Sequence, residues 1–201
     1  MASDITKATY DSIARKWSDE HFELAGTESD LAKFIGYLRK GEKVLDAGCG
    51  PGKHVKMLMD EGFDAVGIDF SKSMLSEAKK RVPKGTFKLM DMRKLLFKDN
   101  TFDGIWCFAS ILHIRKEDAP TVMSEFNRVI KDKGILIISM KRGTGEAFEG
   151  TSKNKRFFSY YAKSDAEKLI TDSGFKMAES YTEKLGNTVW IVIIATAQKH
   201  N

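Results

Sequence analysis

The stretch Lys43-Val44-Leu45-Asp46-Ala47-Gly48-Cys49-Gly50-Pro51-Gly52 decides how this 201-residue chain folds. Its apolar start predicts a buried strand, and the glycines that follow predict a tight loop leading into a helix. Gly48, Gly50 and Gly52 permit backbone conformations and close approaches that a β-carbon would obstruct. We therefore expect a small ligand against this loop.

The composition indicates a globular chain. Hydrophobic residues make up 42% and charged residues 30% of the sequence, as in ordinary globular proteins. No apolar run approaches the ~20 residues that a membrane helix needs. We expect one domain over residues 1–201, with an amino-terminal helical cover over 1–41 and the main sheet with its helices over 42–201.

The cysteines, the amino terminus and the net charge bear on location and partners. Only Cys49 and Cys107 occur, and both fall at expected strand ends or adjoining loops rather than in a disulfide framework or a metal-ligand cluster. We expect no bound metal. The first residues lack a secretory signal, which favours a cytoplasmic protein without a membrane partner. The net charge of +5 comes from dispersed lysines and decides little about partners. We expect no DNA partner, and a monomer or homodimer.

Hydrophobic periodicity predicts strands that alternate with helices. Apolar residues at i, i+3, i+4 and i+7 indicate helices, and short apolar runs bounded by turn residues indicate strands. Helices are expected around residues 10–17, 31–38, 55–59, 71–82, 122–130 and 164–174, and strands at 43–47, 64–69, 87–91, 102–107, 134–140, 176–183 and 188–197.

This alternation predicts an α/β sheet, mostly parallel, with helices on both faces. The last two strands are joined by Gly186-Asn187, a connection short enough for an antiparallel hairpin. In such sheets a ligand binds beyond the carboxyl ends of the strands. The segment 141–163 has no clear periodicity, and loops of that length in compact domains are usually functional or mobile.

The spacing of the glycines favours one cofactor over another. Glycine-rich turns that hold the pyrophosphate of a dinucleotide have the spacing Gly-x-Gly-x-x-Gly. Here the order is Gly-x-Gly-x-Gly, and Asp46 puts a carboxylate at the mouth of the loop, where it would repel a pyrophosphate and attract an ammonium group. We therefore expect S-adenosylmethionine, with S-adenosylhomocysteine as the product, rather than NAD.

Two further acids follow the next two strands. Asp69 is placed to accept hydrogen bonds from both ribose hydroxyls. Asp91 offers an acceptor for the adenine amino group, or alternatively caps the turn that follows it. Further cofactor contacts are expected from Gly48, Cys49, Gly50, Gly52, Phe70, Met74, Met92 and Phe108.

Several motifs resemble those of class I S-adenosylmethionine-dependent methyltransferases. They are Val44-Leu45-Asp46-Ala47-Gly48-Cys49-Gly50-Pro51-Gly52, Gly67-Ile68-Asp69-Phe70-Ser71 with Met74-Leu75, Phe102-Asp103-Gly104-Ile105-Trp106-Cys107, and Val129-Ile130-Lys131-Asp132-Lys133-Gly134-Ile135-Leu136. The similarity covers about residues 10–197, and departs from the family at Asp132, where proline is frequent. It implies a three-layer Rossmann-like fold with a seven-stranded sheet of order 3-2-1-4-5-7-6, strand seven antiparallel. It also implies methyl transfer, without naming the acceptor.

The sequence indicates less clearly which residues bind the methyl acceptor. His113 is a candidate general base, because its ordinary pKa suits neutral pH, although a histidine there is more often structural. Tyr10 is expected to close over the methionine end of the cofactor, and Trp17 to belong to the core. Cations in a partly desolvated cavity would select an acidic small molecule, so we assign the acceptor to Lys141, Arg142, Arg156 and Tyr160. The alternative is that this segment is a solvated, lysine-rich loop.

Two other functions remain open. The run Arg156-Phe157-Phe158 with a late Trp190 is loosely similar to methyltransferases that act on wobble-uridine side chains of tRNA, where it would contact phosphates and stack a base. RNA is thus a possible, less favoured partner. The third reading is a module that binds S-adenosylmethionine without catalysis, since an intact pocket does not prove turnover.

Overall fold

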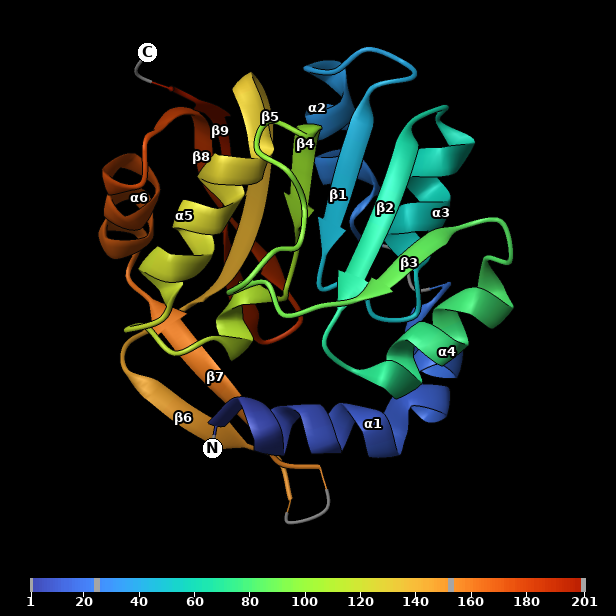
Figure 1. The fold of residues 1–201 in the computed structure, drawn as a ribbon. Coiled ribbons are helices and arrows are strands. Elements are labelled where there is room, and N and C mark those ends of the chain that lie inside the picture. The colour runs from blue at the N-terminus through green and yellow to red at the C-terminus, as the bar shows by residue number, and fades with distance from the viewer. Residues whose placement is uncertain (1, 24–25, 152–153, 200–201) are drawn as a thin grey trace.

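The computed structural model describes residues 2–23, 26–151 and 154–199, and shows a central sheet with helices on both faces (Figure 1). The helices are α1 Ala2–His21, α2 Glu28–Gly36, α3 Lys53–Asp60, α4 Lys72–Arg81, α5 Ala119–Val129 and α6 Lys163–Asp172, with a 3-10 turn η1 Ile111–His113. The strands are β1 Lys43–Ala47, β2 Asp64–Asp69, β3 Thr86–Leu89, β4 Phe102–Cys107, β5 Ile130–Arg142, β6 Glu146–Glu149, β7 Arg156–Tyr161, β8 Phe175–Leu185 and β9 Thr188–Ala197.

The main sheet has the expected strand order. Strands β3, β2, β1, β4 and β5 lie side by side and are parallel. Strand β9 pairs antiparallel with both β5 and β8. Strands β8 and β9 are the predicted sixth and seventh strands, so the order 3-2-1-4-5-7-6 with an antiparallel seventh strand is confirmed.

The segment 141–163, which has no clear periodicity, contains two strands that the sequence reading missed. Strands β6 and β7 form an antiparallel hairpin, and the end of β7 continues parallel to the end of β5 at Lys141 and Arg142. The sheet therefore has nine strands rather than seven. The hairpin escaped detection because its strands are short and β6 is largely exposed, so no alternation of buried and exposed residues marks them.

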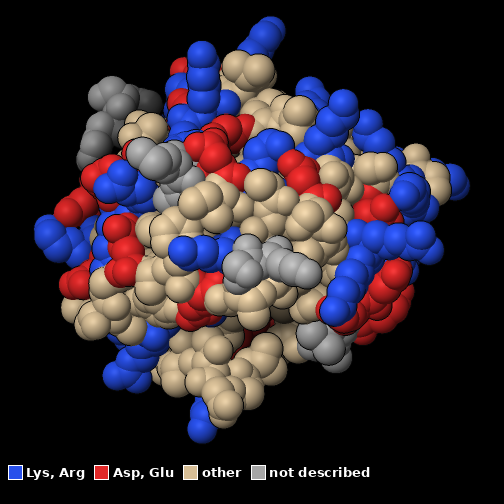
Figure 2. All heavy atoms as spheres, turned by 90° about the horizontal axis from the view of Figure 1, so that it is seen from below, with Lys and Arg blue, Asp and Glu red and all other residues tan. Residues whose placement is uncertain are grey.

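Helix α1 crosses the carboxyl ends of the parallel strands, between the β6–β7 hairpin and α4 (Figure 1). The Phe157 N–H donates to Thr6 Oγ1 over 2.9 Å and ties α1 to β7. The Ser71 Oγ–H donates to Asp11 Oδ1 over 2.7 Å and ties α1 to the start of α4. Seen from below, the centre of this face is mostly uncharged, and many of the Lys and Arg side chains lie toward its rim (Figure 2).

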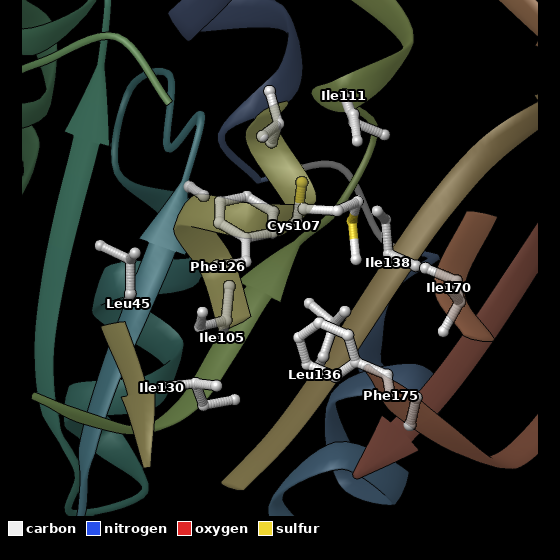
Figure 3. Packing of buried hydrophobic residues seen from close by; sticks show 14 of the residues in the cluster. Leu45, Ile105, Cys107, Ile111, Phe126, Ile130, Leu136, Ile138, Ile170 and Phe175 are labelled. Carbon is white, nitrogen blue, oxygen red and sulfur yellow. The ribbon is translucent and has the colours of Figure 1, made fainter. Parts of the chain in front are cut away.

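Each face of the sheet buries its own hydrophobic cluster. Because neighbouring side chains of a strand point to opposite faces, Leu45 and Ile105 belong to one cluster, whereas Val44 and Trp106 belong to the other. Figure 3 shows the first cluster, which Phe126 of α5 covers. No helix among the described residues is both long and apolar enough to cross a membrane.

Candidate active site

A cavity of about 210 Å³ lies between α1 and the carboxyl ends of the parallel strands. This is many times the ~15 Å³ that one water molecule needs, and acidic atoms are visible deep in a hollow on this face (Figure 2). Eleven of the residues assigned from sequence line it, namely Tyr10, Gly48, Cys49, Gly50, Asp69, Phe70, Met74, Asp91, Met92, Phe108 and His113.

The glycine loop forms one wall of this cavity, and its glycines differ in what requires them. A β-carbon at Gly48 would lie 2.4 Å from Cβ of Ser110. A β-carbon at Gly52 would lie 2.9 Å from the ring of Phe87. Only at Gly50, of these three, does the space for a β-carbon contain no protein atom within 4 Å. Protein side chains therefore explain two of the glycines, and Gly50 alone leaves room for a ligand against the loop.

Asp69 lies at the end of β2 with its carboxylate held by the neighbouring backbone. The Gly50 N–H donates to Oδ2 over 2.9 Å and the Ser71 N–H to Oδ1 over 2.8 Å. Burial raises the pKa of Asp69, and these two hydrogen bonds lower it. The effect of burial is the larger, and the pKa is about 6. A carboxylate has about four lone-pair positions, so each oxygen keeps capacity for one further donor from the cavity.

Asp46 is buried beneath the same loop and does not line the cavity. It is 1% exposed, and its Oδ2 atom has no hydrogen-bond partner among the described residues. Burial, and secondarily the charge of Asp69, raise the pKa of Asp46 well above its ordinary value. An unpartnered buried carboxylate oxygen is costly, so this position favours a cationic group bound nearby.

We expect Asp46→Asn to stabilise the ligand-free protein by on the order of 1 kcal/mol near pH 7, because it removes a buried carboxyl group that must either keep its proton or carry an uncompensated charge. The folded-state pKa is raised, so the unfolded chain releases this proton first as pH rises, and wild-type stability falls above about pH 4. Asp46→Asn has no carboxyl group at this position, so it does not lose stability in this way, and the difference in stability between the variant and the wild type grows with pH. Thermal unfolding from pH 4 to 8 checks this, and parallel Tm curves for the two proteins would contradict it.

Asp91 follows β3 and is paired with Arg93, which sequence reasoning did not identify. The guanidinium contacts both carboxylate oxygens, with Nη2 to Oδ2 at 2.6 Å, and the Arg93 N–H donates to Oδ1 over 2.9 Å. Burial raises the pKa of Asp91, but the hydrogen bonds from Arg93 outweigh it and lower the pKa. Asp91 thus caps its turn and also lines the cavity.

His113 is the centre of a hydrogen-bonded chain. Its Nδ1 lies 2.7 Å from the Phe157 carbonyl oxygen, which can only accept, so Nδ1 carries the proton and Nε2 accepts. The Tyr10 hydroxyl, 2.8 Å from Nε2, therefore donates to it. Arg156 Nη1 in turn donates to the Tyr10 oxygen over 3.2 Å. Burial lowers the pKa of His113 to about 4, so the imidazole is neutral at pH 7 and its lone pair is occupied.

The four residues assigned to the acceptor lie in two places. Arg156 is beside Tyr10, to whose hydroxyl oxygen it donates. Lys141, Arg142 and Tyr160 line a separate, more open hollow with Glu149, whose carboxylate is 3.0 Å from Lys141 Nζ. None of the four lines the cavity that holds Asp69.

Several cavity residues were not assigned to the site from the sequence. The expectation that Trp17 belongs to the core is wrong, because Trp17 lines the cavity together with His21, His54 and Arg93. The helical spacing of Tyr10, Trp17 and His21 was visible in the sequence, but periodicity alone does not say whether a helix face covers a core or a cavity. No group of three or more His, Cys, Asp and Glu side chains among the described residues is arranged to hold a metal ion.

Comparisons with known sequences point to one family. A family model described as a methyltransferase domain matches residues 44–134. A protein of Encephalitozoon cuniculi named as a methyltransferase is 30% identical over 170 residues, covering 74% of this chain and 77% of that protein. A demethylmenaquinone methyltransferase of Beutenbergia cavernae is 35% identical over 101 residues, covering 50% of this chain and 41% of that enzyme. The chain spans about half or less of the length of several other curated relatives that it matches.

Solved structures show the same fold. The magnesium protoporphyrin IX methyltransferase of Synechocystis, solved with bound S-adenosylmethionine, superimposes with a TM-score of 0.78 over 98% of each chain, at 20% sequence identity. At this identity the likeness concerns the fold alone.

Proposed function

This chain belongs to the class I S-adenosylmethionine-dependent methyltransferases, and from that premise we propose that it methylates a small, anionic metabolite bound beneath α1. Members of this family use S-adenosylmethionine as the methyl donor, so family membership identifies the cofactor. The nature of the acceptor is our inference from Arg156 and its surroundings.

The residues around the cavity fit S-adenosylmethionine. Asp69 has free lone pairs for a ribose diol, Gly50 leaves open space against the loop, and the orphaned oxygen of Asp46 favours an ammonium group nearby. We assign the adenine to the wall made by Asp91 and Met92.

The bound cofactor would supply a methyl group on a sulfonium, a leaving group that needs no protonation. The task of the protein is then to hold the acceptor in line with that methyl group and to exclude water. Tyr10 and Ser110 line the cavity between the glycine loop and α1. Ser110 is itself fixed, because its hydroxyl donates to the Ala47 carbonyl over 2.6 Å.

Arg156 carries the proposal of an anionic acceptor. Its guanidinium carbon lies 5.5, 5.0 and 5.4 Å from the ring centroids of Tyr10, Trp17 and Phe158. Its Nε is buried without a hydrogen-bond partner, and it makes no ion pair within the described residues. Glu149, an acid that Arg156 influences, is already engaged by Lys141. A cation partly removed from water with no counter-charge favours an acidic ligand group.

The reaction is tested by incubating the protein with methyl-labelled S-adenosylmethionine and either a metabolite extract or a tRNA pool. We expect label in a small acidic molecule. Calorimetry with S-adenosylmethionine and with NAD tests the cofactor separately, and heat only with NAD would contradict the proposal. Label confined to tRNA would favour the RNA alternative, and cofactor binding without transfer to either pool would favour a non-catalytic module.

The RNA alternative is weakened by the burial of the aromatic run on which it rests. Phe157 and Phe158 are 6% and 3% exposed, so their rings are not available to stack on a base as RNA recognition requires. We therefore retain the small acidic acceptor as the proposed substrate.

Replacing Arg156 with alanine is expected to raise the acceptor KM by on the order of 10- to 100-fold. This is the fold-change that corresponds to losing the charge-assisted hydrogen bonds between the guanidinium and the acidic group of the acceptor. The Kd of the cofactor should change little, because Arg156 does not line the cavity next to Asp69. Steady-state kinetics with the acceptor found above gives the measurement. Lys155→Ala, which removes an exposed neighbouring cation, is the matched control. Equal acceptor KM values for both variants would refute the assignment.

We also expect that titration of His113 contributes nothing to the pH dependence of kcat between pH 6 and 8, measured at saturating substrates. Burial lowers the pKa of this histidine to about 4, so it stays neutral across that range, and its Nε2 lone pair is taken by Tyr10. A pH profile of kcat for wild type and for His113→Gln is the measurement. A limb near pH 6.5 present only in the wild type would make His113 the general base after all.

A further inference from the structure

Helix α1 presents a continuous aromatic surface to the cavity. Tyr10, Trp17 and His21 are spaced at i, i+7 and i+11, which places them on one face of a helix, and all three line the cavity. The Trp17 and His21 rings are stacked, with centroids 3.7 Å apart and planes 8° from parallel. The Tyr10 ring meets Trp17 edge-on at 5.5 Å.

The side of the cavity formed by the sheet also carries flat rings. Phe108, directly after β4, and His54, in the first turn of α3, both line the cavity. The Phe108 ring stacks on Trp106, with centroids 4.9 Å apart and planes 17° from parallel, and Trp106 is fully buried. A core side chain therefore fixes the orientation of this ring in the cavity wall.

Hydrogen bonds hold two of these rings in place. His21 Nδ1 lies 3.0 Å from the Trp17 carbonyl oxygen, and His54 Nε2 lies 3.1 Å from Thr27 Oγ1. Burial lowers the pKa of His54 to about 3, so its imidazole is neutral at pH 7. Fixed rings that line a cavity favour a flat ligand, because offset-stacked and edge-to-face contacts add to the burial of apolar area.

The charge lies at one end of this aromatic surface. Arg156 is 5.0 Å from the Trp17 ring centroid and 5.5 Å from that of Tyr10, measured from the guanidinium carbon, whereas His21 stacks on Trp17 one helical turn further along α1. Building on the proposed function, we propose that the methyl acceptor is a planar aromatic molecule with an acidic substituent. Its ring packs in the cavity that Trp17 and Phe108 line, and its acid group is directed toward Arg156, which lies beside Tyr10 and Trp17.

The test uses the protein saturated with S-adenosylhomocysteine and three matched probes. These are 2-naphthoate, its neutral amide 2-naphthamide, and the saturated acid decahydronaphthalene-2-carboxylate. We expect 2-naphthoate to bind about tenfold or more tightly than either of the other two, because each lacks one of the two recognised features. Calorimetry measures the three Kd values. An amide or a saturated acid that binds as tightly as 2-naphthoate would overturn the proposal.

Two variants separate the contributions. Arg156→Gln should lose the preference for the acid over the amide and keep the preference for the aromatic over the saturated ring. Trp17→Leu should do the reverse, and Lys155→Gln should keep both. Loss of both preferences together in either variant, with binding of S-adenosylhomocysteine intact, would contradict the division of roles. The comparison of probes on the wild type decides the proposal even if a variant does not fold.

Failure of this inference is distinguishable from failure of the proposed function. Binding of S-adenosylhomocysteine is measured first, and its absence would contradict the function itself. Binding of S-adenosylhomocysteine without discrimination among the three probes would reject the aromatic acceptor and leave methyl transfer to a different small molecule standing.

Discussion

Asp69→Ala is expected to weaken binding of S-adenosylmethionine on the order of 100-fold or more. Two hydrogen bonds from the ribose to an ionised acceptor are each worth about 1.5 kcal/mol or more, and every 1.4 kcal/mol is about tenfold in Kd. The effect should be larger than that of any other single substitution in the cavity, because both carboxylate oxygens of Asp69 are already aimed by the Gly50 and Ser71 N–H groups. Calorimetric titration measures it.

The binding should also depend on pH in a defined direction. The pKa of Asp69 is raised to about 6 by burial, so below pH 6 a proton must leave before the carboxylate can accept from the ribose. Affinity should therefore fall by up to about tenfold per unit below pH 6 in the wild type, and less steeply in Asp69→Ala.

Asp103→Ala is the matched control for Asp69→Ala. Like Asp69, Asp103 on β4 accepts two hydrogen bonds, one from the Lys43 N–H over 2.9 Å and one from Lys131 Nζ over 2.7 Å. Unlike Asp69, it lies outside the cavity. Its variant should bind the cofactor as the wild type does. A Kd for Asp69→Ala within a few-fold of that control would show that the ribose is held elsewhere.

Gly48→Ala is expected to destabilise the protein by about 3 kcal/mol or more and to lower its Tm by roughly 10 °C. Two costs add. Gly48 has φ +84°, a left-handed conformation that costs a residue with a β-carbon about 1–2 kcal/mol. The new Cβ would also lie 2.4 Å from Ser110 Cβ, and Ser110 is held by its bond to the Ala47 carbonyl.

Two further variants separate those costs. Gly41 has φ +87° and no atom within 4 Å of its would-be Cβ, so Gly41→Ala should show the conformational cost alone, about 1–2 kcal/mol. The double variant Gly48→Ala with Ser110→Gly removes the contact and should recover the remainder. Thermal or chemical unfolding provides the three values. Equal losses at Gly41 and Gly48 would mean that Ser110 does not require the glycine.

The order of the main sheet could be predicted because local sequence carries it. Apolar runs such as Leu136-Ile137-Ile138 are buried on both faces, which is typical of an interior parallel strand. The β6–β7 hairpin could not be predicted. Its residues pair with one another and only briefly with β5 at Lys141 and Arg142, so its existence depends on partners that no local pattern names.

Many of the residues that line the cavity were also predictable, because they follow the strands directly in sequence. The surroundings of the cations that we propose for the acceptor were not. In the sequence Lys141 and Arg156 are equivalent cations of one loop, yet in the structure Lys141 is paired with Glu149, and Arg156 has no ion pair within the described residues. That difference arises from where the hairpin folds back, which periodicity does not encode.

Strand burial and the glycine loop are local properties of the chain, so the sheet, the family and the side chains that follow β1, β2 and β3 could be predicted from the residues alone. Three other features could be found only in the folded protein: which glycines are required by other side chains, that Trp17 lines a cavity rather than a core, and that His113 is a neutral hydrogen-bond acceptor for Tyr10. Each of these depends on contacts between residues far apart in the chain, such as Gly48 with Ser110 and Tyr10 with Arg156. Their energies are set by distance and burial, which a linear pattern does not contain.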